Sequence, residues 1–503
     1  MKNLAQKNIL ILGLGASGLA LARWCVRCGA QVTVVDTRAA PPKLSELSGV
    51  ASARFVHAAM SEALLALGAF DMVLKSPGLS PQSVAAVMAG AQARHMVCGS
   101  ELSLFAQALV DLKEDRAYTP QVIAITGTNG KTTVTALTGQ LVQRAGKSVA
   151  VAGNIGPTLL DTLAEKLDAQ PGDDGFALLP EVWVLELSSF QLDSVHGFEP
   201  TVATVLNISQ DHLDWHETLP AYVAAKSTVY GLSGLMLLNR DDPQVMAALP
   251  PTVKGKPLRP YLTFGTDAPT QPGDYGIEIA NGMAWLVRAA EADETIKRRK
   301  EQELVLHIQR LMPLQALRIQ GRHNAANALA ALGLAVAAGC TLAPMLHGLR
   351  DYRGEPHRVE SVAVLNEVEY FDDSKGTNVG ATVAALAGLG ADRKLVLILG
   401  GEGKGQDFSP LLEPVSRYAR AVVLIGRDAA LIKAALAASQ VPLWAVTTMD
   451  EAVTTAAAQA KPGDAVLMSP ACASFDMFDG YEHRAQAFCE AVQGLTQDQG
   501  AVL

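Results

Sequence analysis

The stretch Gln121-Val-Ile-Ala-Ile-Thr-Gly-Thr-Asn-Gly-Lys-Thr-Thr133 decides the fold of the central part of this chain. Its apolar, β-branched start is typical of a buried strand, and a helical segment follows its end. The glycine-rich turn between them brings backbone N–H groups and a helix N-terminus around one anion. The stretch therefore predicts an α/β unit that binds the phosphates of a nucleotide.

The residues of this turn have distinct predicted roles. Lys131 can reach the outer phosphates, and the Thr132 hydroxyl is placed to hold Mg²⁺. A common phosphate loop has glycine five residues before Gly130, but this chain has Ile125 there, which disfavours motor proteins and GTPases. The competing interpretation is a glycine turn with an incidental lysine. The residues expected to bind the nucleotide are Gly127, Thr128, Asn129, Gly130, Lys131, Thr132 and Thr133.

A second glycine-rich turn lies near the start of the chain. The run Gly13-Leu-Gly-Ala-Ser-Gly18 follows an apolar strand, and Asp36 ends the next strand. This pattern is the dinucleotide fingerprint with its acidic ribose partner, and alone it indicates NAD. An NAD-linked dehydrogenase is therefore the alternative from a different class. No constellation for nicotinamide reduction appears elsewhere in the sequence, and this alternative leaves the phosphate loop without a role.

Short apolar strands alternate with helical segments along most of the chain, which predicts mainly parallel sheets with helices on both faces. A chain of 503 residues is too long for one hydrophobic core. The charged run 111–116 predicts a linker, and Gly354 to Arg358 interrupts the pattern again. We expect three α/β domains: a Rossmann-like N-terminal domain at 1–114, a P-loop-type central domain at 115–354 and a dinucleotide-fold-like C-terminal domain at 355–503.

The composition disfavours several classes of protein. A formal net charge of −9 gives no general attraction to nucleic acid or to an acidic membrane surface. The segment 325–349 is long enough to span a bilayer, but Gly339 and Pro344 interrupt it and predict a buried soluble helix. Cys25 and Cys28 lie in an apolar helical pattern and are expected to be thiols on one helix. We expect a cytoplasmic monomer, with the charged segment 288–303 as a surface excursion.

The phosphate loop and several further segments resemble the superfamily of Mur ligases and folylpolyglutamate synthetases, and they occur in the order of its D-glutamate-adding branch. The matching segments are 153–156, 185–192, 207–214, Lys226, 321–327, 356–358, 373–378 and 469–474. The match has gaps near 161–181 and 288–315. Other branches fit less well, because the MurC type carries His at position 129 and the MurE type carries an arginine motif that is absent here. Another ligase of this superfamily is nevertheless the nearest alternative.

The resemblance implies a metal site beside the phosphates. Glu186 ends one apolar strand and His212 follows another, so both lie at strand ends where open α/β sheets bind ligands. A carboxylate and an imidazole there can share Mg²⁺, and the resemblance implies two such ions, held also by Thr132. It further implies that Lys226 is carbamylated by CO₂ and becomes an anionic metal ligand. Helical spacing alone instead predicts an exposed lysine at this position.

The resemblance also assigns the remaining ATP contacts. Asn324 and Asn327 match the segment that reads adenine, and Asp373 contacts the nucleotide. Arg358 and Lys375 match residues that handle phosphate and place the last domain, although a His-Arg pair in a linker can be purely structural. The implied catalytic residues are thus Lys131, Glu186, His212, Lys226, Arg358 and Lys375.

Two further substrates are implied by the resemblance. The first domain holds the UDP end of UDP-N-acetylmuramoyl-L-alanine, for which Arg38 as an ordinary surface cation is the alternative reading. The residues for this substrate are Gly15, Ala16, Ser17, Asp36, Thr37, Arg38, Ser76, Gly78, Asn154, Ser188 and Gln191. The residues for D-glutamate are Thr377, Lys404, Ser474, Phe475 and Tyr481. Tyr481 departs from the Phe that is frequent in the family, and Gly376 departs from Ala.

The implied reaction belongs to peptidoglycan precursor synthesis. A carboxylate attacks the ATP γ-phosphate to give an acyl phosphate, and the amine of D-glutamate then displaces phosphate to give an amide. The sequence names no base for the amine.

Overall fold

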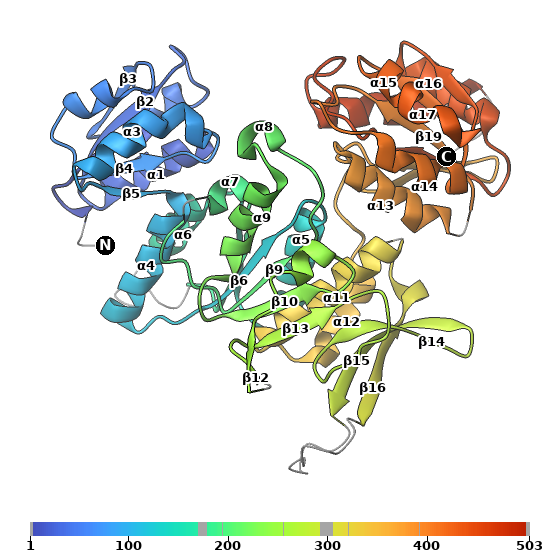
Figure 1. The fold of residues 1–503 in the computed structure, drawn as a ribbon, viewed down its shortest axis with the longest axis horizontal. Helices are drawn as coiled ribbons and strands as arrows, with labels where there is room; N and C mark the ends of the chain where they lie inside the picture. The colour runs from blue at the N-terminus through green and yellow to red at the C-terminus, as the bar shows by residue number, and fades with distance from the viewer. Residues whose placement is uncertain are drawn as a thin grey trace.

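The computed structural model describes residues 4–169, 179–193, 195–254, 256–291, 305–319, 321–391 and 393–498. Its strands form three large sheets, each built from its own segment of the chain, and a ribbon of β11 (Thr252–Val253) and β12 (Lys256–Pro257). In Figure 1 the first segment (blue) and the last (orange) lie on either side of the central segment. Of the predicted excursion 288–303, residues 292–303 lie outside the described residues.

The first sheet has five parallel strands in the order β3-β2-β1-β4-β5. Its interior strands are apolar runs that are buried along nearly their whole length, as expected for a parallel sheet covered on both faces. The strands are β1 (Asn8–Leu12), β2 (Gln31–Asp36), β3 (Ala53–His57), β4 (Met72–Lys75) and β5 (Val97–Gly99). The helical elements are α1 (Ala16–Arg27), α2 (Leu44–Leu47), η2 (Glu62–Ala66), α3 (Pro81–Ala93) and α4 (Glu101–Arg116).

The central sheet has nine strands in the order β16-β15-β14-β13-β10-β9-β6-β8-β7. The seven strands from β14 to β7 pair in parallel, but β15 and β16 extend the sheet beside β14 through antiparallel pairings that alternating βα units did not predict. The strands are β6 (Gln121–Thr126), β7 (Val149–Gly153), β8 (Val182–Glu186), β9 (Val202–Val205), β10 (Leu235–Asn239), β13 (Tyr261–Phe264), β14 (Tyr275–Ala280), β15 (Met283–Glu291) and β16 (Leu306–Pro313).

Helices cover this sheet on both sides. The phosphate-loop helix α5 and the alanine-rich α11 share one apolar core with strands β6, β8 and β10. The helices are α5 (Lys131–Arg144), α6 (Leu159–Asp168), α7 (Ser189–Leu192), α8 (Leu213–His216), α9 (Leu219–Ser227), η3 (Thr228–Tyr230), α10 (Pro243–Met246), η4 (Leu314–Ala316), α11 (Arg322–Ala337) and α12 (Leu342–Asp351). Segment 325–349 thus forms most of the buried α11 and of α12, which buries one face only, and none of the helices in the described residues has the length and apolar character of a membrane span.

The third sheet has six strands in the order β17-β18-β22-β19-β20-β21, all parallel except the edge strand β17. The strands are β17 (Glu360–Leu365), β18 (Val368–Asp372), β19 (Leu395–Gly400), β20 (Ala419–Ile425), β21 (Leu443–Ala445) and β22 (Ala465–Met468). The helices are α13 (Val379–Gly390), η5 (Ser409–Leu411), α14 (Leu412–Tyr418), α15 (Ala429–Ala435), η6 (Ala437–Ser439), α16 (Met449–Gln459) and α17 (Tyr481–Asp498).

The charged run 111–116 is helical, which corrects its interpretation as a linker. It forms the last turns of α4, and Lys113 and Arg116 there face the negative end of the helix dipole. The opposite face of α4 is apolar, and Phe105 packs edge-on against Trp183 of β8 with ring centroids 5.1 Å apart. This burial keeps the segment helical and joins the first part of the chain to the central sheet.

Candidate active site

The phosphate loop lies between β6 and α5, at the carboxyl end of the central sheet (Figure 1). Gly130 has a positive φ of 83°, and a Cβ there would lie 2.7 Å from Asn327 Oδ1, so the close approach of α11 requires glycine. Lys131 donates to the carbonyl oxygens of Gly127 and Thr128, both at 2.8 Å. Burial lowers the pKa of Lys131, while Glu186 and Asp211 oppose that shift. The loop thus holds its lysine at the mouth of an anion site.

Lys226 is 1% exposed, so the exposed lysine predicted from helical spacing is wrong. Helix α9 packs this side of its surface against the phosphate loop, where Tyr222 Oη lies 3.1 Å from Thr128 Oγ1. Lys226 Nζ donates to Gly127 O at 2.8 Å and to Thr126 Oγ1 at 3.2 Å. Burial, together with the charge of Lys131, lowers the pKa of Lys226 well below its ordinary value. A neutral amine is the form of lysine that reacts with CO₂.

Glu186 is the other buried charge at this site. It ends β8 and is 1% exposed, and its Oε1 accepts a hydrogen bond from Asn154 Nδ2 at 2.9 Å. Its Oε2 is buried with no hydrogen-bond partner among the described residues. A buried carboxylate oxygen without a donor is costly unless a cation meets it. The position therefore fits a divalent metal ion, which prefers such oxygen ligands.

His212 lies at the start of α8 with a positive φ of 53°. Its side chain is 42% exposed, and its Nε2 lies 3.6 Å from Asp211 Oδ2. The ring packs edge-on against Phe190 with centroids 4.7 Å apart. This placement leaves the imidazole at the surface of the site, beside the carboxylate of Asp211.

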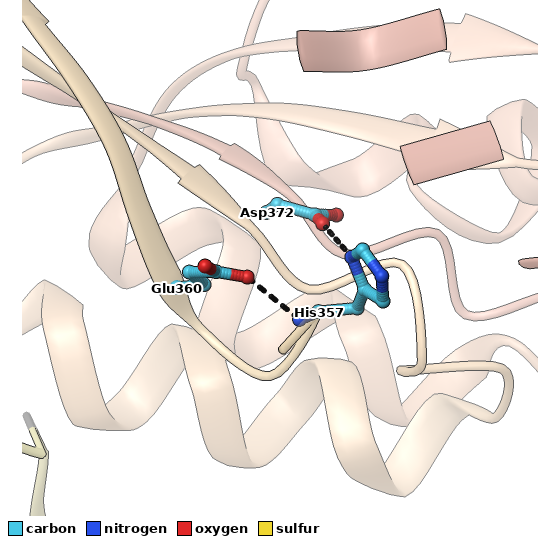
Figure 2. Close-up of side chains that lie close together, drawn as sticks. All are labelled: His357, Glu360 and Asp372. Atoms are coloured by element: carbon cyan, nitrogen blue, oxygen red, sulfur yellow. Dashed lines mark hydrogen bonds and ion pairs between the residues drawn. The ribbon is translucent and has the colours of Figure 1, made fainter. Parts of the chain in front are cut away.

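Arg358 comes from the segment that joins the central and last parts of the chain. Its guanidinium donates to Thr132 Oγ1 at 2.7 Å and so reaches the phosphate loop. Figure 2 shows how the preceding residue is fixed: His357 Nδ1 pairs with Asp372 Oδ2 at 2.7 Å, and its backbone N–H donates to Glu360 at 2.9 Å. Ligand atoms of these three side chains lie within 4.8 Å of one another. Because Asp372 and Glu360 already accept hydrogen bonds from His357, we interpret the cluster as a clamp that places Arg358.

A cavity of about 370 Å³ brings most of the predicted nucleotide residues together. Leu206 and Phe264 give it an apolar part, and Asn327 donates to Asn324 Oδ1 at 3.1 Å on its wall. Its lining includes the predicted residues Asn129, Gly130, Thr133, Asn324, Asn327, Arg358, Asp373 and Lys375. An apolar slot with a few amide groups, next to a phosphate loop, suits a purine nucleotide.

Asp373 and Lys375 enter this cavity from the third sheet. Asp373 is 7% exposed, and burial raises its pKa to about 7 although Ser469 Oγ donates to its Oδ2 at 2.7 Å. Burial and the charge of Arg358 lower the pKa of Lys375. Its Nζ lies 3.6 Å from the ring centroid of Tyr481. The predicted aromatic residue at position 481 therefore contacts a cation beside the nucleotide cavity.

The predicted UDP residues of the first segment gather at the carboxyl end of the first sheet. Asp36 Oδ2 accepts from the Leu14 N–H at 2.8 Å, and the two Asp36 oxygens accept three hydrogen bonds from Arg38. The Arg38 guanidinium lowers the pKa of Asp36 to about 2. Ser76 donates to Gly13 O at 3.0 Å and ties its own loop to the glycine turn. Gly15, Thr37 and Gly78 lie on the turns that follow strands of this sheet, and Ala16 and Ser17 begin α1.

The remaining predicted substrate residues lie on the central sheet. Asn154 is exposed and contacts Glu186, while Ser188 and Gln191 bond to each other in a capping box that begins α7. A buried ion pair of Lys75 and Asp193 at 3.0 Å joins β4 to the end of this helix. Both substrate regions are therefore connected through α7, a contact that the sequence did not predict.

Four of the five predicted D-glutamate residues lie on three neighbouring loops of the third sheet, while the fifth, Tyr481, begins α17. Gln406 connects them, because its Oε1 accepts from the Val379 N–H and its Nε2 donates to Ala471 O. Backbone bonds between Glu402 and Ala473 close the arrangement. Lys404 and Phe475 are exposed, Phe475 by 67%, and Ser474 is buried at 3%. Thr377 precedes α13 on the third loop.

Several residues of the site were missed by sequence reasoning. Asn207 and Asn378 bond to the predicted residue Asn129, Ser469 bonds to the predicted residue Asp373, and Asp211 accepts from Asn378. All four lie within the segments that resemble the ligase superfamily, so this resemblance was the sequence signal that could have identified them. Their partners are far away in the sequence, which is why the contacts needed a folded chain.

Three descriptions of protein families match this chain. The Mur ligase MurD-like N-terminal domain matches residues 7–98, the Mur ligase middle domain matches 125–335, and the Mur ligase glutamate ligase domain matches 357–472. Together these matches cover the three sheets in chain order.

Relatives that align with this chain over nearly their whole length carry one name. The UDP-N-acetylmuramoylalanine--D-glutamate ligase of Albidiferax ferrireducens is 64% identical over 100% of this chain and 99% of the relative. The ligases of the same name from Polaromonas sp. and Burkholderia thailandensis are 58% and 54% identical, covering 100% and 98% of both chains.

Solved structures share the fold at low identity. The UDP-N-acetylmuramate-alanine ligase MurC of Thermotoga maritima aligns with a TM-score of 0.52 at 19% identity, over 97% of this chain and 100% of that one. The MurF ligase of the same organism, solved in complex with ADP, aligns with a TM-score of 0.56 at 14% identity, over 99% and 97%.

Proposed function

The chain belongs to the Mur ligase family, and from this premise we propose that it joins D-glutamate to the L-alanyl carboxylate of UDP-N-acetylmuramoyl-L-alanine with conversion of ATP to ADP and phosphate. The observation that carries the proposal is the set of relatives of this name, 54–64% identical over nearly the whole chain. The chain would act in peptidoglycan precursor synthesis in the cytoplasm. The NAD-linked alternative has no support from these relatives.

The chain's own residues support the first step. The substrate carboxylate attacks the γ-phosphate of ATP, and negative charge develops on the transferred phosphoryl group. Lys131 lies on the loop, and Arg358 reaches Thr132 of the same loop from the other side. Together with Lys375 they offset this charge. The amine of D-glutamate then attacks the acyl phosphate, phosphate leaves, and an amide remains.

The proposal includes two Mg²⁺ ions. Their protein ligands would be Glu186, His212, Thr132 and a carbamylated Lys226. The buried free oxygen of Glu186 and the depressed pKa of Lys226 fit that assignment. When bound, the metal neutralises phosphate charge and polarises the transferred group. Carbamylation removes the cost of a second buried cation beside Lys131, because it replaces an amine by an anion.

The three segments divide the substrates among them in this proposal. Residues 1–114 hold the UDP end, 115–354 hold ATP, and 355–503 hold D-glutamate. The grouping of Asp36 and Arg38 at the first sheet, the cavity beside the phosphate loop, and the loops around Gln406 support these assignments. The first boundary falls inside α4, and the enzyme is proposed to be a monomer.

The function is tested by measuring ADP release from ATP with UDP-N-acetylmuramoyl-L-alanine and one amino acid at a time. We expect release with D-glutamate, and much slower release with L-glutamate, L-alanine and meso-diaminopimelate. NAD with candidate hydroxy acids should give no change in absorbance at 340 nm. Release that depends on another amino acid would move the protein to a different branch of the family.

A further inference from the structure

The side chains of Asn129 and Asn378 form a reciprocal pair of hydrogen bonds between the phosphate loop and the third sheet's first helix. Asn129 Nδ2 donates to Asn378 Oδ1 at 3.3 Å, and Asn378 Nδ2 donates to Asn129 Oδ1 at 3.1 Å. Asn378 Nδ2 also lies 3.4 Å from Asp211 Oδ2, which is the residue before His212. The pair therefore joins the phosphate-binding part of the site to the part proposed to hold D-glutamate.

Both members of the pair are fixed by their own surroundings. The Asn129 backbone N–H donates to Asn207 Oδ1 at 2.8 Å, and Asn207 Nδ2 donates back to Asn129 O at 3.0 Å. Asn378 is the N-cap of α13, and its Oδ1 accepts from the Ala381 N–H at 2.8 Å. Asn378 is 6% exposed. Because the Asn129 backbone and the Asn378 side chain are each held by other partners, the pair fixes the position of α13 relative to the loop.

Gly380, in the first turn of α13, provides an independent observation. A Cβ at Gly380 would lie 2.6 Å from Ser209 Oγ, 3.1 Å from Ser209 Cβ and 3.3 Å from Asn129 Nδ2. Helix α13 therefore approaches the segment after β9 so closely that a side chain at this position would have to displace the Ser209 hydroxyl or separate the two segments. The two observations describe one contact surface, with hydrogen bonds at Asn378 and close packing at Gly380.

We propose that Asn378 is a positioning residue that docks the third sheet onto the phosphate loop and thereby places Thr377 for the incoming amino acid. Thr377 directly precedes Asn378, so the docked position of one sets the position of the other. The inference rests on the proposed function and adds how the amino-acid site is assembled. A ligand that binds only the docked arrangement has an apparent affinity proportional to the docked population. Loss of the pair should therefore weaken the binding of D-glutamate, while the turnover of the enzyme saturated with D-glutamate should stay nearly unchanged.

Asn378→Ser is the variant that separates docking from helix capping. Serine caps a helix about as well as asparagine, but its short side chain cannot reach Asn129. Loss of the two neutral hydrogen bonds to Asn129, together with the long contact to Asp211, predicts an increase of about 5- to 100-fold in the KM for D-glutamate, with kcat within about twofold of the parent. A variant that is merely misfolded would show the reverse, a lower kcat at unchanged KM. That reverse pattern, or unchanged kinetics, would overturn the proposal.

Gly380→Ala tests the packing half of the contact. Alanine in place of a helical glycine favours the helix by itself, so the melting temperature should stay equal or rise. The added methyl group should nevertheless separate α13 from Ser209 and raise the KM for D-glutamate. Gly494→Ala is the matched control, because a Cβ at Gly494 of α17 meets nothing within 4 Å. Equal KM values for the two alanine variants would contradict the proposal.

A double-mutant cycle with Asn129→Ala and Asn378→Ser completes the test. If the two side chains act through each other, their effects on the KM for D-glutamate should not multiply. The increase in KM of the double variant should be at least about threefold smaller than the product of the two single increases. Fully multiplicative effects would show that the pair does not act as a unit. Failure of the proposed function is recognised separately, since the parent enzyme itself would then release no ADP with D-glutamate.

Discussion

Lys131 and Lys226 donate to the same carbonyl oxygen, that of Gly127, each from 2.8 Å. One lysine belongs to the phosphate loop and the other comes from α9, almost one hundred residues later in the chain. Two ammonium groups on one oxygen repel each other. Burial, and after it the charge of Lys131, lowers the pKa of Lys226, and conversion of Lys226 to an anion would remove the repulsion between the two lysines.

Lys226→Ala tests that conversion. If Lys226 carries a carbamate, its loss removes an anion from the metal site, and activity should fall by roughly 10²–10³. Millimolar acetate should restore part of that activity, because a short carboxylic acid can occupy the vacated space and present its oxygens. ¹³C NMR with ¹³C-bicarbonate should show a carbamate resonance in the parent that the variant lacks. Full activity of the variant without added acid would exclude the carbamate.

Lys131→Ala should lower kcat by roughly 10²–10³ while the fold is retained, since Lys131 acts on the charge that develops on phosphate. Acetate should not restore this variant, which distinguishes it from Lys226→Ala. Lys433→Ala, an exposed lysine of α15, is the control and should behave like the parent. Near-normal turnover of a well-folded Lys131→Ala protein would contradict the assignment of the phosphate loop.

Asp373→Asn should change how stability depends on pH. Burial raises the pKa of Asp373 from 3.8 to about 7, so between these values the folded state binds more protons than the unfolded state. The contribution of this group to the unfolding free energy therefore falls as pH rises, and its cost is complete above about pH 7. Between pH 5 and pH 8, the unfolding free energy of Asp373→Asn should rise by on the order of 1 kcal/mol or more relative to that of the parent. Urea unfolding at both pH values measures this difference. The same pH dependence of the unfolding free energy in the parent and the variant would refute the prediction.

Arg38→Ala should weaken binding of UDP by about 10- to 100-fold, because charged hydrogen bonds are lost and the Asp36 carboxylate loses its cationic partner. Calorimetry on the full chain should show heat with UDP for the parent and none with NAD. Arg54→Ala is the control, since Arg54 lies on β3 and bonds to Thr33 Oγ1 and Leu67 O. NAD binding without UDP binding would reverse the functional proposal for the first sheet.

The local elements of the site were predictable because short-range rules govern them. A β-branched run, a glycine turn and a helix at 121–144 can fold in few other ways, and the same holds for the turn at Gly13. Glu186 and His212 were placed near strand ends by the position of their apolar strands alone. The antiparallel pairings of β15 and β16 were not predicted, because strand direction depends on which neighbour a strand pairs with.

The sequence by itself determined the α/β class, the phosphate loop and the family resemblance, since these depend on residues that are adjacent in the chain. Only the tertiary structure decided that Lys226 is buried beside Lys131, that Glu186 has a buried oxygen with no donor among the described residues, and that Asn129 meets Asn378. Each of these depends on a partner about 100 to 250 residues away or on the exclusion of water around a side chain. Burial and long-range contact are properties of the packed chain, and no local pattern of residues carries them.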